Sequence, residues 1–330
     1  MKILVAGGAG YVGSVLAPML QERGHEVTVA DQCWFGNRLP ASVPVVETDL
    51  FALDDAALAG FDRVVFLAGL SNDPMAEYDP AMNFIQNGAL PAYLAFRAKQ
   101  AGVGRFIYGS SCSVYGYTLD KLYNEDAPVT CPYPYGISKL QGERGVLQMG
   151  EDGFSVIALR QGTVNGHSPR MRFDLIVNTM CKSARTTGRI TVNNPAIWRP
   201  LIDVRDTSEA FLRAVEADPG VSGVFNVAKD NYTVGQVAER VAEALKRLTG
   251  QSTEIEVLHR HDLRNYKVDC AQARAVLGFS PQRDIEEMVL SLHEHWDEYG
   301  DPEEERYHNI RVFKRLHPGL SAPVSLLPGT

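Results

Sequence analysis

A tyrosine and a lysine lie four residues apart in the stretch Tyr135-Gly136-Ile137-Ser138-Lys139. On a helix this spacing places both side chains on the same face. A phenol normally keeps its proton until about pH 10, but a neighbouring ammonium favours the phenolate and lowers the tyrosine pKa. The pair could therefore supply a general base near neutral pH. Many surface helices contain the same spacing by chance, so the rest of the chain must decide whether it marks an active site.

A glycine-rich turn lies near the start of the chain. Gly7, Gly10 and Gly13 follow the spacing Gly-x-x-Gly-x-x-Gly between a short apolar run and a helical pattern. Such glycines allow a tight turn, let the backbone approach a pyrophosphate and leave the anion at a helix N-terminus. Asp31, about 20 residues further on, ends the second apolar run and can accept hydrogen bonds from a ribose. Its charge would repel a 2′-phosphate, so the pattern predicts a site for NAD rather than NADP.

Further cofactor contacts are expected where the following apolar runs end. Asp49 and Leu50 could hold an adenine, although an aspartate that only caps a helix is the simpler alternative. Leu67-Ala68-Gly69 offers small residues at which a cofactor could approach the backbone, and Asn87 could support the site from a helix, with an exposed asparagine as the alternative. The expected cofactor-binding residues are Gly7, Gly10, Tyr11, Val12, Gly13, Asp31, Asp49, Leu50, Leu67, Ala68, Gly69, Asn87, Ser110, Tyr135 and Lys139.

Short apolar runs alternate with helical patterns through the first half of the chain, which predicts an α/β fold with a Rossmann-type doubly wound parallel sheet. The alternation becomes irregular beyond about residue 166, so a smaller C-terminal substrate-binding α/β lobe is expected. Strands are predicted over 3–6, 27–30, 43–48, 63–67, 105–109, 155–159 and 190–192. Helices are predicted over 11–23, 80–100, 135–149, 173–186, 207–216, 233–249 and 285–299.

These patterns predict two domains. Residues 1–165 should form the NAD-binding domain, to which a segment near 190–228 returns. Residues 166–189 and 229–330 should form the substrate-binding lobe, with a tail from residue 300 that wraps over the surface. A chain of 330 residues is long enough for two cores.

Composition limits the class of protein. The net charge of −8 disfavours nucleic acid as a partner. The five cysteines form no Cys-x-x-Cys pair and are odd in number, which is typical of reduced thiols in a cytoplasmic protein. No apolar run approaches the roughly 18 residues of a membrane span, and the N-terminus is interpreted as a strand rather than a signal peptide. The two His-x-His pairs lack a third ligand nearby, so no metal site is expected.

Four further segments combine with the glycine turn. They are residues 106–116 (Phe-Ile-Tyr-Gly-Ser-Ser-Cys-Ser-Val-Tyr-Gly), 134–139 (Pro-Tyr-Gly-Ile-Ser-Lys) with the Gly-Glu at 142–143, 159–166 (Leu-Arg-Gln-Gly-Thr-Val-Asn-Gly) and 198–206 (Trp-Arg-Pro-Leu-Ile-Asp-Val-Arg-Asp). Together they resemble the extended short-chain dehydrogenase/reductase family, in its NAD-dependent nucleotide-sugar epimerase/dehydratase branch. The resemblance covers roughly residues 1 to 300.

The resemblance implies a catalytic role for three residues. Ser111 would position the sugar hydroxyl, Tyr135 would act as the base, and Lys139 would hold the nicotinamide ribose while lowering the tyrosine pKa. It also implies NAD as cofactor, a nucleoside-diphosphate hexose or heptose as substrate, and a homodimer formed through the helices over 80–100 and 135–149.

One departure from the family pattern narrows the reaction. The 4,6-dehydratases carry an acidic residue and a glutamate after the catalytic Ser/Thr, where this chain has Cys112 and Ser113. Neither residue can act as a carboxylic acid or base, so a dehydratase is disfavoured. Epimerisation at C4 through a transient 4-keto sugar is the expected reaction. A 4-dehydrogenase or 4-ketoreductase with net redox change is the alternative, and a non-catalytic NAD-binding sensor is disfavoured by the complete catalytic set.

The substrate side depends on arginines. By resemblance, Arg199 would bind the diphosphate, because a guanidinium is always charged and can bond in a bidentate manner. Arg170, Arg172, Arg260 and Arg264 are weaker candidates, for which a solvated surface arginine is an open alternative. The expected substrate-binding residues are Ser111, Cys112, Ser113, Thr163, Arg172, Arg199 and Arg264.

Overall fold

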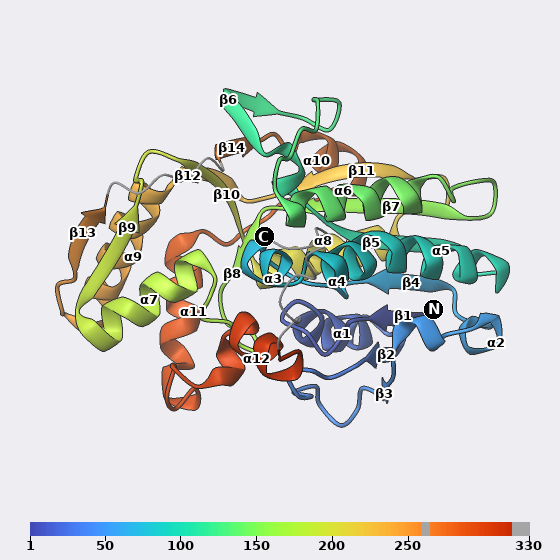
Figure 1. Cartoon of the computed structure of the whole chain (residues 1–330), viewed down its shortest axis with the longest axis horizontal. Coiled ribbons are helices and arrows are strands. Elements are labelled where there is room, and N and C mark those ends of the chain that lie inside the picture. The colour runs from blue at the N-terminus through green and yellow to red at the C-terminus, as the bar shows by residue number, and fades with distance from the viewer. Residues whose placement is uncertain (259–264, 319–330) are drawn as a thin grey trace, which may run out of the picture.

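The computed structural model describes residues 1–258 and 265–318, and its central element is a seven-stranded sheet (Figure 1). The strands run in the order β11-β7-β5-β4-β1-β2-β3, and every neighbouring pair is parallel. The predicted doubly wound parallel sheet is therefore confirmed. The strands are β1 (Lys2–Ala6), β2 (Glu26–Asp31), β3 (Val45–Glu47), β4 (Arg63–Phe66), β5 (Arg105–Ser111), β7 (Ser155–Gln161) and β11 (Gly223–Val227).

Helices cover both faces of this sheet (Figure 1). Successive side chains of a strand point to opposite faces, so Ile3 and Val5 enter one apolar cluster while Leu4 and Ala6 enter the other. Burial on both faces explains why the strands are continuous apolar runs in the sequence. One face is covered by α1 (Gly13–Glu22) and α8 (Val204–Glu216), and the other by α5 (Leu90–Gln100) and α6 (Pro134–Leu147).

A second lobe lies at the carboxyl ends of the strands, on the left of Figure 1. Its apolar core is formed by residues between 171 and 307, together with Tyr11 from the glycine turn. Three small sheets belong to this half: β12-β10-β8, β13-β9 and β14-β6. Their strands are β6 (Tyr117–Tyr123), β8 (Thr163–Asn165), β9 (Arg189–Asn193), β10 (Trp198–Asp203), β12 (Asp230–Thr233), β13 (Glu254–Leu258) and β14 (Asn265–Val268). The helices of this half are α7 (Ile176–Thr187), α9 (Val234–Thr249), α11 (Ile285–Glu294) and α12 (Asn309–Leu316), whereas α10 (Ala271–Leu277) packs against β11 and α8 of the large sheet.

The long helix predicted over 80–100 is divided into three segments. α4 (Pro80–Phe84) is followed by a π-helical turn, Ile85–Ala89, and then by α5. Pro91 has no N–H, so it cannot donate to the carbonyl of Asn87 four residues earlier, and its ring crowds that carbonyl. The carbonyl of Asn87 instead accepts a hydrogen bond of 3.2 Å from the Tyr108 hydroxyl. The single predicted helix is therefore wrong at its centre.

Two predicted helices begin or end at other residues in the structure. The helix predicted over 285–299 ends at Glu294 and is followed by a 3₁₀ turn, Trp296–Glu298. The helix predicted over 207–216 begins at Val204, because the Asp203 carboxylate caps its first turn. The tail expected to wrap over the surface contains α12, whose Phe313 is fully buried. The remaining short elements are the helices α2 (Asp55–Leu58) and α3 (Asp73–Tyr78) and the 3₁₀ turns Leu50–Ala52, Cys112–Tyr115 and Glu305–Tyr307. Within the described ranges, no helix is long and apolar enough to cross a membrane.

A buried arginine joins β5 to the end of α8. Arg105 is fully buried, and its guanidinium donates to the carbonyl oxygens of Ala214, Ala217 and Asp218. Its Nε donates to the hydroxyl of Ser155 on the neighbouring strand. The last carbonyls of a helix lack intrahelical partners, so this side chain satisfies groups that would otherwise be buried without hydrogen bonds.

Replacing Arg105 with methionine should lower the free energy of unfolding by about 3 kcal/mol or more, because several buried carbonyls lose their donor. Urea denaturation measures the change. Arg213→Met is the matched control. Among the described residues Arg213 forms an ion pair with Glu209 alone, on the exposed surface of α8, so its loss should change the value by about 0.5 kcal/mol at most. Equal effects of the two substitutions would contradict this account of Arg105.

Candidate functional site

Two adjoining cavities lie at the carboxyl ends of the sheet. The larger has a volume of about 690 Å³ and is lined by Ala68 after β4, Ser111 of β5 and Gln161 of β7. The smaller, of about 100 Å³, is lined by Asp31 and Leu50. They meet beside β1 and β4, where the strand order reverses, which is where open α/β sheets bind ligands. Both cavities are lined by Gly7, Gly10, Phe35, Leu67, Ala68, Gly69 and Leu70.

The glycine turn leaves no room for side chains. A Cβ on Gly7, whose φ is +81°, would lie 2.4 Å from the backbone nitrogen of Ala68. A Cβ on Gly13 would lie 2.4 Å from the carbonyl oxygen of Gly8. The bare backbone beside Gly10 therefore forms a cradle at the junction of the cavities, which fits the pyrophosphate of a dinucleotide.

Asp31 lies at the far end of this cradle. Its carboxylate accepts backbone hydrogen bonds from Ala9 (3.0 Å) and Cys33 (2.7 Å). Burial raises the pKa of Asp31, while these backbone hydrogen bonds oppose that rise. An orientated carboxylate facing the smaller cavity suits the ribose of an adenosine. Asp49, in contrast, caps the turn Leu50–Ala52 by accepting from the N–H of Phe51.

Asn87 supports the site from behind. It is fully buried, and its amide donates to the carbonyl of Leu70 and to the Asn83 side chain, each at 2.9 Å. Its Oδ1 has no hydrogen-bond partner among the described residues and would lie 2.0 Å from a Cβ on Gly69. Only glycine, with a φ of +119°, therefore fits at residue 69.

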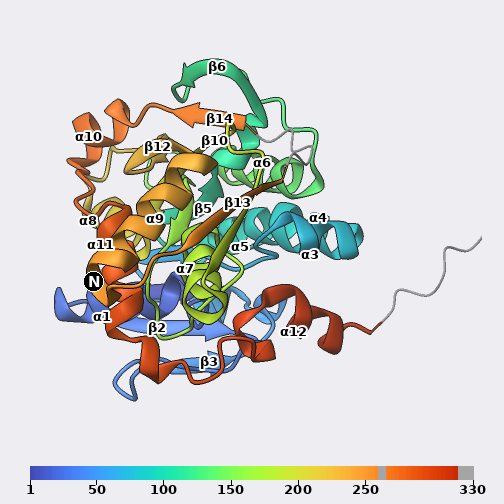
Figure 2. The same ribbon diagram turned by 90° about the vertical axis from the view of Figure 1, so that its left-hand side faces the viewer.

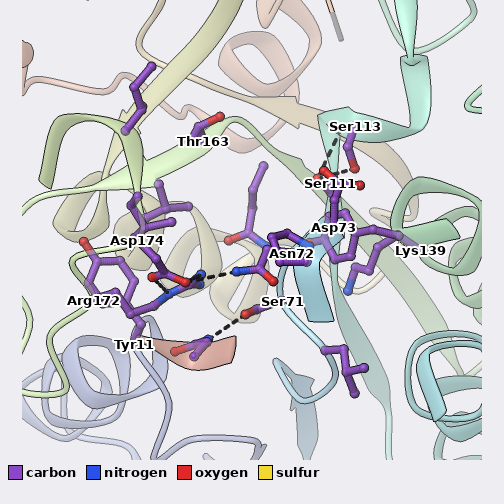
Figure 3. A pocket seen from close by; sticks show the side chains of 18 of the residues that line it. Tyr11, Ser71, Asn72, Asp73, Ser111, Ser113, Lys139, Thr163, Arg172 and Asp174 are labelled. Carbon is purple, nitrogen blue, oxygen red and sulfur yellow. Dashed lines mark hydrogen bonds and ion pairs between the residues drawn. The ribbon is translucent and has the colours of Figure 1, made fainter. Parts of the chain in front are cut away.

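Three side chains meet at the wall of the larger cavity, and Figure 3 shows two of them, Ser111 and Lys139. Tyr135 and Lys139 extend from the first turns of α6, and Ser111 ends β5. The Ser111 hydroxyl is hydrogen-bonded to Tyr135 and accepts from the hydroxyl of Ser113 at 2.9 Å. The Lys139 ammonium lies 4.5 Å above the ring of Tyr108. The structure thus brings together the three residues predicted to be catalytic.

The pKa of Tyr135 is shifted in the direction opposite to the predicted one. Burial raises the pKa of Tyr135 to about 12, the charge of Asp73 adds to the rise, and the hydrogen bond from Ser111 opposes it. Burial also lowers the pKa of Lys139 to about 7, although Glu143 opposes this shift. The predicted lowering of the tyrosine pKa is therefore wrong for this structure, because burial is the dominant effect. Positive charge brought to the cavity would favour the phenolate.

A buried ion pair fixes this part of α6. Glu143 lies one turn beyond Lys139, is 1% exposed and accepts 2.6 Å and 2.9 Å hydrogen bonds from Arg160 of β7. The Ser110 hydroxyl donates to the same carboxylate at 2.6 Å, and Arg160 donates to the hydroxyl of Tyr115. This pair was not predicted from the sequence, although Glu143 follows Lys139 at helical spacing.

Arginines and acidic groups face one another on the opposite wall (Figure 3). Arg172 forms a bidentate pair with Asp174 at 2.9 Å and 3.0 Å, and Asp174 accepts a 3.0 Å hydrogen bond from Asn72. Arg170 and Arg172 are 3% and 7% exposed, so the alternative of solvated surface arginines was wrong for both. The charge of Arg172 lowers the pKa of Tyr135, in opposition to the dominant effect of burial.

Arg199 lines the far end of the larger cavity with Thr163. Arg199 is 9% exposed, donates to the carbonyl of Trp198 and lies 5.5 Å above the ring of Tyr266. A held guanidinium beside an aromatic ring can bind a phosphate or a nucleobase edge.

Some of the other residues predicted for the site line the cavities, and others do not. The larger cavity is also lined by Tyr11, Val12, Gly13, Ser110 and Ser113. Asp49, Asn87 and Cys112 line neither cavity. Cys112 is 1% exposed and donates to the carbonyl of Arg160, so it cannot contact a sugar there. Arg260 and Arg264 lie outside the described residues. Cavity residues that the sequence analysis missed are Phe35, Asn72, Asp73, Asp174, Tyr266, Asn309 and Ile310.

One group of potential metal ligands exists among the residues with described positions, and it lies apart from the cavity lining. It consists of His167, His295 and Glu298, with the two imidazole rings stacked at 3.6 Å. Burial lowers the pKa of His167 to about 4, and the charges of His295 and Arg205 add to the shift. His167 therefore stays neutral near pH 7.

Lys139→Met in the cofactor-free chain should raise the free energy of unfolding, and by more at pH 6 than at pH 9. The folded-state pKa of about 7 lies below the unfolded value of 10.5, so the unfolded chain binds more protons between these values and wild-type stability rises with pH. Urea denaturation at both pH values provides the measurement, with the exposed Lys246→Met as control. A difference between Lys139→Met and wild type that does not change with pH would refute the assignment.

Residues 3–228 match the model of a family described as the NAD dependent epimerase/dehydratase family. The chain is 28% identical over 305 residues to a UDP-glucose 4-epimerase of Corynebacterium glutamicum, covering 86% of this chain and 91% of that protein. It is 29% identical to a UDP-glucose 4-epimerase of Streptomyces lividans, covering 86% and 92%. Among solved structures, MoeE5 in complex with UDP-glucose and NAD is similar with a TM-score of 0.80 and 27% identity, covering 91% and 100%.

Proposed function

This chain belongs to the NAD dependent epimerase/dehydratase family, and we propose that it is an NAD-dependent epimerase that inverts C4 of a nucleoside-diphosphate sugar. The observation that carries the proposal is the meeting of Ser111, Tyr135 and Lys139 in the same cavity as the glycine cradle. The UDP-glucose 4-epimerases among its relatives and the UDP-glucose bound to MoeE5 support a UDP-hexose as the first substrate to test.

In the proposed mechanism, Tyr135 in its phenolate form takes the proton of the sugar 4-hydroxyl, and the hydroxyl of Ser111 donates a hydrogen bond to that sugar oxygen. When bound, NAD would accept the hydride from C4, return it to the other face of the sugar and place positive charge beside the phenol. Tyr135 then gives its proton back to the 4-keto oxygen. The reaction needs a sugar that can turn over in the cavity between the two steps.

Lys139 holds the nicotinamide ribose in this proposal, and the charge of the buried Glu143 favours the ammonium form of the lysine. Asp31 accepts from the adenosine ribose, and Leu50 lines the adenine end of the smaller cavity. On the substrate side, Arg199 binds the diphosphate, and Arg172 contacts the sugar. Cys112 takes no part, because its thiol is enclosed against Arg160.

The geometry of the segment that follows Ser111 also argues against elimination of water from the sugar. The position that follows the catalytic serine is buried, and the next, Ser113, uses its hydroxyl to donate to Ser111. Neither supplies a carboxylate to the sugar. An epimerase and a net oxidoreductase would use the same residues, and they differ in the fate of the hydride.

We also propose a homodimer formed through α4, α5 and α6. Large apolar side chains, Ile85 and Phe96, are 48% and 45% exposed along this face, and such exposure favours an interface. The proposed division into an NAD-binding domain over 1–165 and a substrate-binding lobe is unchanged, with α8 and β11 returning to the sheet. Five unpaired cysteines support a cytoplasmic location.

The C4 assignment can be tested with a panel of UDP-, GDP-, ADP-, CDP- and dTDP-sugars, with products identified by NMR. For the accepted sugar, a substrate carrying deuterium at C4 should give an epimer that keeps the label at C4, because the hydride returns within one active site. Release of the label into added NAD, with a steady rise in NADH absorbance, would instead identify the net oxidoreductase.

Tyr135→Phe should lower kcat by about 10² to 10⁴-fold, the contribution of a general acid–base group, while sugar-nucleotide binding stays close to wild type. Calorimetry and product NMR give the two values. Tyr93→Phe is the matched control, because within the described part of the chain the hydroxyl of Tyr93 on α5 donates only to the solvent-exposed carbonyl of Phe51. Wild-type turnover in Tyr135→Phe would exclude this mechanism.

A further inference from the structure

The C-terminal helix α12 lies beside the cofactor end of the larger cavity, although it is more than two hundred residues away from the glycine turn in the chain. It packs against α3 (Figure 2). Asn309 and Ile310, at its start, line the larger cavity with Phe35 and Arg170. This helix is therefore part of the cavity wall and not a surface appendage.

The side chain of Asn309 joins two separate parts of the site. Its Oδ1 accepts a 2.6 Å hydrogen bond from Arg170, which precedes α7 in the second lobe. Its Nδ2 donates to the hydroxyl of Ser71 at 2.7 Å, in the loop after β4, as the dashed line to Ser71 in Figure 3 shows. Asn309 is 3% exposed, so both hydrogen bonds are protected from water and hold the lobe to the loop.

Phe313 fastens the same helix to the loops around the cofactor site. It is fully buried and packs against Leu70 and Met75. Its ring centroid lies 5.8 Å from that of Trp34, in the loop after β2, and 5.9 Å from that of Tyr78 at the end of α3. Trp34 lines the smaller cavity. One turn of α12 thus contacts the loops after both β2 and β4, which enclose the two cavities.

Arg170 lies over the junction of the two cavities. Its guanidinium is 3.8 Å above the ring of Phe35, which lines both cavities with Gly10. Its Nε has no partner among the residues that the structure describes, although the side chain is buried. A dinucleotide extending from Asp31 into the larger cavity must pass this junction with its pyrophosphate. A buried guanidinium with unused donor capacity is suited to that anion.

We propose that α12 completes the dinucleotide site: Asn309 positions Arg170 over the pyrophosphate, and Phe313 keeps the enclosing loops closed, so NAD leaves only when α12 detaches. This inference rests on the NAD-dependent function proposed above and adds a role for the chain end. An epimerase recovers its NAD in the starting form after each turnover and has no need to exchange it. An enzyme with net redox change must release it.

The test measures exchange of bound NAD in the full-length holoenzyme, without any sugar. Unlabelled holoenzyme is mixed with excess deuterated NAD, and the bound fraction is followed by mass spectrometry after rapid desalting. Asn309→Asp keeps the size of the side chain but adds a negative charge that competes with the pyrophosphate for Arg170. Phe313→Ala removes the buried contact with the loops. Each should accelerate exchange by about tenfold or more, as expected for the loss of one charge-assisted contact or one core side chain.

Arg315→Ala is the matched control, because Arg315 lies on the same helix and, of the residues whose positions are described, pairs with the exposed Glu305 alone. Its exchange rate should stay within about twofold of wild type. Far-UV circular dichroism and thermal unfolding check that each variant is folded. If Phe313→Ala does not fold, Asn309→Asp alone provides the test. Loss of NAD from folded Asn309→Asp during purification would support the proposal equally.

Exchange rates that are the same in wild type and Asn309→Asp would overturn the proposal, whether both are slow or both complete within the mixing time. The result is independent of the C4 assignment, because no sugar is present. Slow exchange that Asn309→Asp accelerates, in a protein that converts no sugar nucleotide, would support the role of α12 and contradict the proposed epimerase.

Discussion

The buried ion pair between Glu143 and Arg160 is the interaction on which the geometry of the site depends. Charged groups inside a protein are costly unless they are paired and fully hydrogen-bonded, and this pair is both. Burial lowers the pKa of Arg160, but the hydrogen bond and charge of Glu143 raise it overall, so the guanidinium stays charged. The pair fixes α6 against β5 and β7, which places Tyr135 and Lys139 beside Ser111.

The same enclosed interior sets the chemistry of the tyrosine. Burial opposes both the phenolate of Tyr135 and the ammonium of Lys139, so the pKa of the tyrosine rises and the pKa of the lysine falls. Positive charge delivered with the cofactor would reverse this balance, which ties proton transfer to an occupied NAD site. Because proton transfer depends on bound NAD, the enzyme benefits from holding its cofactor between turnovers. In the proposed role of α12, Asn309 and Phe313 provide that retention from the opposite end of the chain.

Local patterns predicted the parts of the fold that local physics controls. The strands of the parallel sheet are apolar because both faces are buried, and the turn at Gly7 and Gly13 requires glycine because neighbouring backbone occupies the side-chain positions. The helix over 80–100 was misjudged at its centre. Pro91 removes one hydrogen bond there, and the π-helical turn depends on the distant Tyr108, which supplies the replacement donor.

The sequence by itself determined the parallel sheet, the glycine cradle, and the segments that carry Ser111, Tyr135 and Lys139, because each is encoded in residues that are close together in the chain. Only the tertiary structure decided which polar groups share the cavity. Asn72 donates to Asp174, the partner of Arg172, across 102 residues of the chain, and Asn309 donates to Ser71 across 238 residues. Burial is likewise a property of the packed molecule, and it reversed the sign of the expected pKa shift at Tyr135. Spacing along a chain specifies neighbours on one element, whereas desolvation and charge depend on everything that packs around it.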